Sequence, residues 1–165
     1  MMSMYVQEEE KAMEKVVPSL WFDNQAEEAV DYYASVFKEV TVKNVSRFGE
    51  MGPGEKGKVM TMSFSLNGQD FFAINGGPHY SFTPAVSFSI NCETQADIDH
   101  YWNHLSDGGE PGLCGWLVDK FGVSWQVVPT ILGVLLQDPN PEKALRVSKA
   151  MLGMEKLDIE QLQQA

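Results

Sequence analysis

The pattern of apolar and polar positions predicts the same order of elements twice along the chain. In the first half, residues 16–22 are rich in β-branched and aromatic residues, which is typical of a strand. Apolar residues then recur at spacings of three and four over 25–37, which predicts an amphipathic helix. Three more strands are predicted over 41–48, 58–66 and 69–75. The first half therefore reads as a β-α-β-β-β module.

Turn and cap signals separate these elements. Asp23-Asn24 stands where the helix begins and is a helix-cap signal. Asn67-Gly68 lies between two apolar runs, and both residues tolerate the positive φ of a type I′ hairpin turn. A glycine-rich stretch over 49–57 precedes a strand and not a helix. It is therefore interpreted as a mobile hairpin connection or lid, not as a nucleotide-binding loop.

The second half repeats this order in a shorter form. Residues 85–91 alternate as Val86, Phe88 and Ile90 against polar residues, which predicts a half-buried strand. A helix follows over 95–105, with Thr94 as its cap. Its apolar face repeats the spacing of the first helix 68 positions later, as Ile98 against Val30 shows. Strands are predicted over 113–118 and 124–128, and the sixth strand is weak or missing.

We therefore predict one structural domain of class α+β. It comprises a flexible leader over 1–14, a first module over 15–78, a second, shortened module over 79–130, and a helical tail over 131–165. The tail contains helical patterns near 131–137, after Pro139, and over 158–164. These helices have an apolar face to bury, either on their own sheet or on another subunit.

Composition excludes several classes of partner. The chain has 165 residues, with 12 basic and 23 acidic side chains and a formal charge of -11, which disfavours nucleic acid. Its apolar stretches fall short of the roughly 20 residues that span a bilayer. Glu8, Glu9 and Glu10 do not fit a signal peptide, so a cytoplasmic location is expected. Cys92 and Cys114 are expected to be free thiols.

Several motifs resemble the PhnB-like family of the vicinal oxygen chelate superfamily, often described as 3-demethylubiquinone-9 3-methyltransferase. The motifs are Asn75-Gly76-Gly77-Pro78, Val86-Ser87-Phe88, Tyr101-Trp102, Cys114-Gly115-Trp116-Leu117, Asp119-Lys120-Phe121-Gly122 and Ser124-Trp125-Gln126-Val127-Val128-Pro129. The resemblance covers about residues 16 to 160. It implies the glyoxalase/bleomycin-resistance fold, in which curved sheets form a cup that is commonly completed in a homodimer.

Metal-using members of this superfamily hold a divalent ion through His, Glu or Gln on strands one, four, five and eight. Here the corresponding strands offer Ser19, Asn75, Ser87 and Ser89, and only Gln126 is a plausible donor. We therefore predict no metal and no other cofactor. His100 and His104 share a helix face at the spacing of a zinc pair, but a solvated face is the better interpretation because no third ligand accompanies them.

The predicted function is a metal-independent protein that binds or sequesters a small organic molecule. Strand alternation and the implied cup select its lining, a mixture of aromatic, hydroxyl and amide groups that suits a neutral or weakly polar ligand. The predicted pocket residues are Ser19, Trp21, Asn75, His79, Ser87, Ser89, Trp116 and Gln126. Among these, His79 is also a candidate acid or base.

Two other interpretations remain open. The protein is alternatively an enzyme, either a divergent metal-dependent lyase or dioxygenase that uses Gln126, or a methyltransferase as the family description states. A third interpretation makes the dimer a scaffold, with the helical tail serving another protein.

Overall fold

The computed structural model describes residues 16–165, and the leader predicted over 1–14 lies outside this range. The first module consists of β1 (Ser19–Phe22), α1 (Ala26–Val36), β2 (Val40–Arg47), β3 (Val59–Leu66) and β4 (Gln69–Asn75). The second consists of β5 (Phe88–Cys92), α2 (Gln95–Leu105), β6 (Glu110–Pro111), β7 (Trp116–Val118) and β8 (Ser124–Pro129). The tail forms α3 (Leu132–Leu136), α4 (Pro141–Leu152) and α5 (Ile159–Gln164). The predicted α+β class and repeated order are confirmed.

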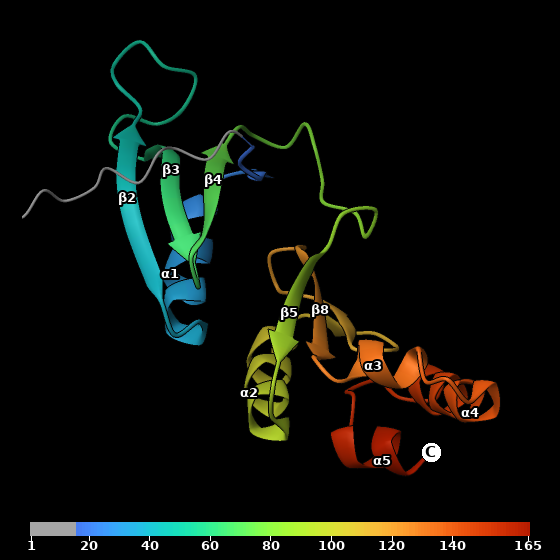
Figure 1. Ribbon diagram of the computed structural model, residues 1–165. Helices are drawn as coiled ribbons and strands as arrows, with labels where there is room; N and C mark the ends of the chain where they lie inside the picture. The colour runs from blue at the N-terminus through green and yellow to red at the C-terminus, as the bar shows by residue number, and fades with distance from the viewer. Residues whose placement is uncertain (1–15) are drawn as a thin grey trace, which may run out of the picture.

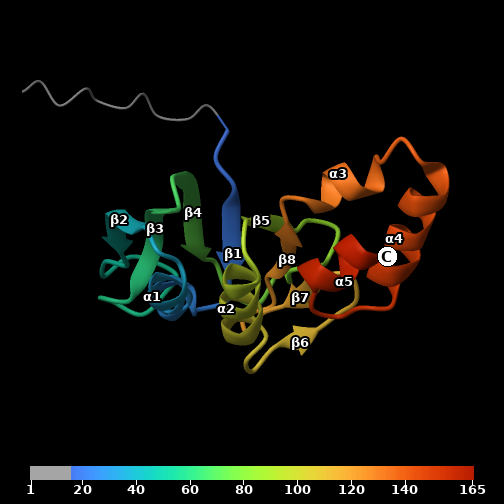
Figure 2. The same ribbon diagram turned by 60° about the horizontal axis from the view of Figure 1, so that its bottom comes forward.

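The two modules have the same sheet topology. Strand orders are β1-β4-β3-β2 and β5-β8-β7-β6, and the first pair of each sheet is parallel while the other pairs are antiparallel. The sheets lie next to each other, with α1 and α2 in contact on one side of them (Figures 1 and 2). We call the opposite side the helix-free face because α1 and α2 do not cover it; the tail helices reach it at Val128 of β8. Each sheet thus has one face packed on a helix and one face without that cover.

One hydrophobic core extends through both modules, and the tail has a second core of its own. The first contains the predicted helix faces, including Val30 and Tyr33 of α1 and Ile98 and Leu105 of α2, all fully buried. The second core consists of Leu132, Leu135, Val147, Leu157 and Leu162. Val128, on the helix-free face of β8, packs against this second core. The tail therefore buries its apolar face on its own module.

The N-terminus of α1 is capped from outside the helix. The Asp23-Asn24 cap predicted above does not form, and the N-cap residue Gln25 makes no side-chain cap bond. The backbone N–H of Ala26 instead donates to Asn75 Oδ1 at 2.8 Å. At α2 the predicted cap is confirmed, since Thr94 accepts a bond from the N–H of Asp97 at 3.1 Å. At α1, but not at α2, a side chain from a strand therefore takes the place of the local cap.

Two strand predictions need correction. The fifth strand starts at Phe88 and not at residue 85, because Val86 belongs to a turn with Thr83 and is 67% exposed. The seventh starts at Trp116 and not at residue 113, because Cys114 and Gly115 have φ values of 58° and 80°. Positive φ is incompatible with an extended strand. The hairpin at Asn67-Gly68 is confirmed, with φ values of 46° and 85°.

Backbone contacts fasten the tail to the second module. The N–H groups of Cys114 and Gly115 donate to the carbonyls of Met154 and Glu155 at 2.7 and 2.8 Å. The Gln95 amide donates to the carbonyl of Leu157 and accepts from the N–H of Ile159. The left-handed conformation at Cys114 and Gly115 thus delays the start of β7 and presents two backbone donors to the tail.

A buried carboxylate joins the two modules. Asp119, which is 3% exposed, accepts hydrogen bonds from Tyr33 Oη of α1 at 2.7 Å and from Trp125 Nε1 of β8 at 2.8 Å. Its other oxygen accepts the backbone N–H groups of Phe121 and Val123. Burial raises the pKa of Asp119 above its ordinary value, and these hydrogen bonds oppose the shift. One side chain therefore holds both a turn and the contact between modules.

Both cysteines are free thiols, as predicted. Burial raises the pKa of the Cys92 thiol to about 11, which disfavours a reactive thiolate. In the part of the chain that the structure describes, no helix has the length and apolar character needed to cross a membrane.

Candidate functional site

Strand alternation places four of the predicted pocket residues on the helix-free face. In β1, Leu20 and Phe22 are buried towards α1, whereas Ser19 and Trp21 point the other way and are more exposed. In β5 and β8, Ser89 and Gln126 are cross-strand partners on the same face. The helix-free face is thus a mixed surface of hydroxyl, amide and aromatic groups.

A cavity of about 470 Å³ lies over the first sheet, and we call it the sheet cavity. Its floor is one row across all four strands, formed by the cross-strand partners Ser19, Phe72, Ser63 and Asn44. Lys43 and Asp70 also line it, with Lys43 Nζ 2.6 Å from Asp70 Oδ1. The sheet cavity therefore combines an aromatic surface, short polar groups and one ion pair.

A second cavity of about 530 Å³ lies between the modules, and we call it the seam cavity. Both modules contribute to its lining, with Asn67, Gln69 and Phe71 on one side and β5 with its preceding Ser87 on the other. Its lining contains aromatic and aliphatic side chains together with neutral hydroxyls and amides, and no charged side chain among the described residues. Phe71 lines both the seam cavity and the sheet cavity, so the two adjoin.

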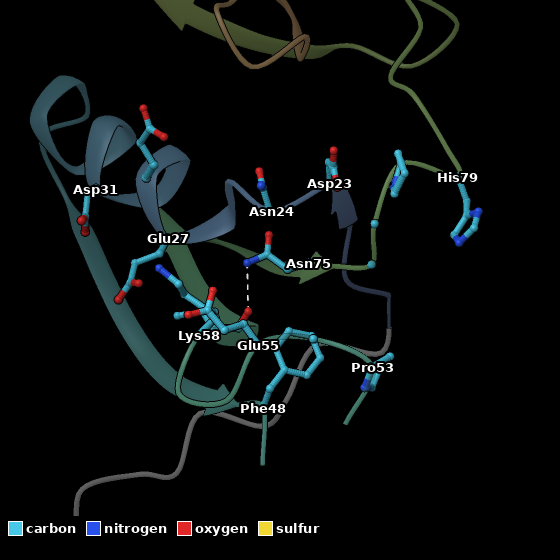
Figure 3. A pocket seen from close by; sticks show the side chains of 16 residues that line it. Asp23, Asn24, Glu27, Asp31, Phe48, Pro53, Glu55, Lys58, Asn75 and His79 are labelled. Atoms are coloured by element: carbon cyan, nitrogen blue, oxygen red, sulfur yellow. Dashed lines mark hydrogen bonds between the residues drawn. The ribbon is translucent and has the colours of Figure 1, made fainter. Parts of the chain in front are cut away.

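A third cavity, the acidic cleft, is about 830 Å³ and lies at the N-terminal end of α1 (Figure 3). The loop between β2 and β3 forms one wall, through Phe48, Pro53 and Glu55, and α1 contributes Glu27 and Asp31 to the other. Five carboxylates line the cleft, those of Asp23, Glu27, Glu28, Asp31 and Glu55. Glu27 is paired with Arg47 at 2.9 Å. The chemistry of this cleft is unlike that of the other two.

The structure distributes the predicted pocket residues instead of gathering them. Ser19 lines the sheet cavity, Ser87 and Ser89 line the seam cavity, and Asn75 and His79 line the acidic cleft. Trp21, Trp116 and Gln126 line none of these three cavities. The Gln126 amide donates to Ser87 Oγ at 2.9 Å, so it adjoins the seam cavity through that hydroxyl.

Two of the predicted pocket residues, Asn75 and Trp21, form hydrogen bonds that stabilise the fold. Asn75 caps α1 and also donates to the carbonyl of Val59 at 2.9 Å, the bond drawn in Figure 3. The Trp21 indole donates to the carbonyl of Gly77 at 2.9 Å, and its ring lies so close to Gly76 that a Cβ there would be 2.1 Å away. The Asn-Gly-Gly-Pro motif thus allows the linker to cross the face of this tryptophan.

The donor set does not fit a divalent-metal centre. Among residues 16–165, no three His, Cys, Asp or Glu side chains are grouped so as to hold a metal ion. His100 Nε2 donates to the carbonyl of Val36 at 2.7 Å, and His104 Nδ1 bonds the carbonyl of His100 at the same distance. Each ring of this helical pair therefore has one nitrogen bound to the backbone.

Sequence reasoning missed the residues that give these cavities their character. Asn67 was assigned only to a turn, yet its side chain bonds Tyr101 Oη at 3.2 Å and lines the seam cavity. Lys43 and Asp70 fall within the strands predicted over 41–48 and 69–75 but were given no role. No signal in the sequence marks them, because their meeting depends on a β-bulge and on strand order.

Known proteins with similar sequences and structures indicate the family of this chain. The sequence matches the family described as 3-demethylubiquinone-9 3-methyltransferase over residues 14–128. A solved structure described as a putative 3-demethylubiquinone-9 3-methyltransferase, PhnB protein, from Bacillus cereus is 36% identical with a TM-score of 0.67. The match covers 71% of this chain and 100% of that one. No curated protein matches the chain.

Two further solved structures are similar at lower identity. Protein PA1353 from Pseudomonas aeruginosa is 24% identical, with a TM-score of 0.61, and the match covers 69% of this chain and 96% of that one. A glyoxylase/bleomycin resistance protein/dioxygenase domain from Frankia sp. EAN1pec is 12% identical, with a TM-score of 0.43 and coverage of 72% and 93%. The match over residues 14–128 and the 36% identity with the PhnB protein lead to one conclusion: the chain belongs to the PhnB-like family described as 3-demethylubiquinone-9 3-methyltransferase.

Proposed function

We propose that this protein binds or sequesters a small organic molecule without a metal ion, and that the seam cavity is its main site. The observation that supports this most is the lining of that cavity. Both modules contribute, and the side chains combine aromatic rings such as Phe88 and Trp125 with the neutral polar groups of Ser87, Ser89 and Asn91. Sites of this composition, at a junction between structural units, are typical of small-molecule pockets.

The volume of the seam cavity suits a ligand of two or three fused rings. At about 530 Å³ it lies within the usual range for ligand pockets, roughly 300 to 1,000 Å³. A charged ligand gains nothing from this lining, whereas a neutral molecule finds hydrogen-bond donors and acceptors at Ser89 and Asn67. We therefore propose a neutral, weakly polar aromatic molecule as the ligand class.

The proposal includes a cytoplasmic homodimer. The helix-free face leaves Trp116 and Phe72 only half-buried. A second copy placed on this face would cover Trp116 and narrow the mouths of the sheet and seam cavities. Sedimentation of the full chain, with and without Trp116→Glu, tests this part separately from ligand binding, because Trp116 lines none of the three cavities.

Filling the seam cavity is expected to weaken binding of a neutral aromatic probe. The probe is 1-aminoanthracene, whose fluorescence rises in an apolar site, titrated into the full chain. Ser89→Trp places an indole in the cavity and should weaken binding at least about tenfold, because the volume is lost. Ser81→Trp is the matched control, since Ser81 is exposed and lines none of the three cavities.

Probe titration, metal analysis and calorimetry together discriminate between the proposed binding function and the two enzymatic alternatives. Unchanged probe affinity after dialysis against a chelator supports the metal-independent function. Stoichiometric metal in the purified protein, lost with Gln126→Ala, would instead support the lyase or dioxygenase. Heat released on titrating S-adenosylmethionine into the protein would support the methyltransferase. Equal probe affinity in Ser89→Trp and the native chain would remove the seam cavity as the site.

A further inference from the structure

We propose that the sheet cavity is a subsite for an aromatic carboxylate, with the ring on Phe72 and the carboxylate accepting from Lys43 Nζ. This inference rests on the proposed small-molecule function and extends it to a second ligand class. Lys43 and Asp70 are the only charged side chains that line the sheet cavity among the described residues. The seam cavity beside it has none, so the two cavities should favour ligands of different charge.

A β-bulge aims Lys43 at this position. In the pairing of β2 with β3, Val42 lies opposite Phe64 and Asn44 lies opposite Ser63, so Lys43 is the extra residue. A bulge turns its side chain out of the regular alternation, and bulges are frequent beside functional sites for that reason. The ammonium group reaches across β3 to Asp70, at the start of β4.

The ion pair presents its cation to the cavity. The Asp70 side chain is 14% exposed and that of Lys43 is 42% exposed, so a ligand meets the ammonium first. A lysine ammonium has three N–H donors, of which Asp70 takes one at 2.6 Å. The remaining donors can form charge-assisted hydrogen bonds with a carboxylate, while Asp70 keeps the group charged and in place.

The floor of the cavity complements the rest of such a ligand. Phe72 lies between Ser19 and Ser63 in the row across the sheet, so an aromatic ring stacked on it has a hydroxyl on either side. Asn44 ends the row on β2, next to Lys43. A ring with oxygen substituents therefore finds both its apolar and its polar partners here.

The experiment compares two probes of the same shape and different charge. We expect 2-naphthoate to bind the full chain about tenfold more tightly than 2-naphthamide, since hydrogen bonds to charged groups are the stronger. Lys43→Met should remove this preference by weakening naphthoate alone. Lys56→Met is the matched control, because Lys56 pairs with Glu50 on the exposed loop, away from the cavity. Ligand-observed NMR measures both affinities.

A second variant separates recognition from folding. Asp70→Asn removes the competing carboxylate, so naphthoate should bind at least as tightly as to the native chain. Equal losses of naphthoate affinity in Lys43→Met and Asp70→Asn would overturn the proposal, since the pair would then only support the sheet. Equal binding of the two probes by the native chain would also overturn the sheet-cavity proposal, but it would not affect the proposal that the seam cavity is the main site. If neither probe nor 1-aminoanthracene binds, the proposed function itself fails.

Discussion

Replacing Asp119 with alanine is expected to lower the free energy of unfolding by about 3 kcal/mol or more, the largest loss we predict for one side chain. The carboxylate accepts four hydrogen bonds, and the partners Tyr33, Trp125 and Val123 are themselves buried. Alanine leaves these donors without acceptors in a site closed to water. Urea denaturation followed by far-UV circular dichroism measures the change.

Two milder variants identify the cause of this loss. Asp119→Asn keeps the volume but replaces one acceptor oxygen with an N–H₂ group, which then faces either Trp125 Nε1 or the backbone N–H groups of Phe121 and Val123. Because these groups can only donate, about 1–3 kcal/mol should be lost. Tyr33→Phe removes one donor and should cost only about 1 kcal/mol. Asp107→Asn, at an exposed position, is the control and should change stability by less than about 0.5 kcal/mol. A loss in Asp119→Ala no larger than in Tyr33→Phe would contradict the role of Asp119.

Asp119 also has a defined pH signature. Burial, the largest influence, raises its pKa in the folded protein above the value of 3.8 that applies when the chain is unfolded. A raised pKa means that the folded state binds the proton more tightly, so this contribution to stability is full at low pH and is lost as pH rises through the folded pKa. The stability of the native chain relative to Asp119→Asn should therefore grow as pH falls from about 7 to about 4. A difference that shrinks over this range would show that the pKa is lowered.

Gly115→Ala is expected to cost about 3 kcal/mol and to loosen the tail. Gly115 has φ of 80°, which an L side chain rarely adopts, and a Cβ there would be 2.5 Å from the backbone carbonyl of Val127. That carbonyl belongs to β8, so it cannot move without disturbing the sheet. The Gly115 N–H also holds the tail through Glu155 at 2.8 Å. Hydrogen exchange over residues 141–165 and urea denaturation measure the two consequences.

A second glycine separates backbone strain from crowding. Gly57 has φ of 85°, but a Cβ at this position meets no heavy atom within 4 Å. Gly57→Ala should therefore cost only about 1 kcal/mol, the price of the left-handed conformation alone. If Gly115→Ala and Gly57→Ala are equally stable, the close approach of Gly115 to β8 does not limit stability.

The motifs that carried the family resemblance are explained largely by structural needs. Asp119 joins the modules, Gly115 lets the chain pass β8, and Asn75 caps α1. Such motifs identify the fold well because each depends on a contact that only this fold makes. They are poor guides to the ligand for the same reason, and this is why Asn75, chosen as a pocket residue, has both its amide atoms occupied by the backbone.

The sequence by itself determined the order of elements and the two helix faces. These follow from local periodicity, since Val30 and Ile98 occupy equivalent positions in equivalent patterns. Local signals failed at the N-terminus of α1, where a distant side chain supplies the cap, and before β7, where positive φ at Cys114 delays the start of the strand. Sequence periodicity does not contain that information.

Only the tertiary structure decided which side chains share a cavity. Ser19 and Ser87 are separated by the 68 positions of the repeat, yet they line different cavities because one sheet carries the row beneath Lys43 and the other borders the seam. The meeting of Lys43 with Asp70 depends on a single bulged residue and on a strand order that puts β3 between their strands. Cavities arise from pairing register and from the junction of modules, which are long-range properties of the fold.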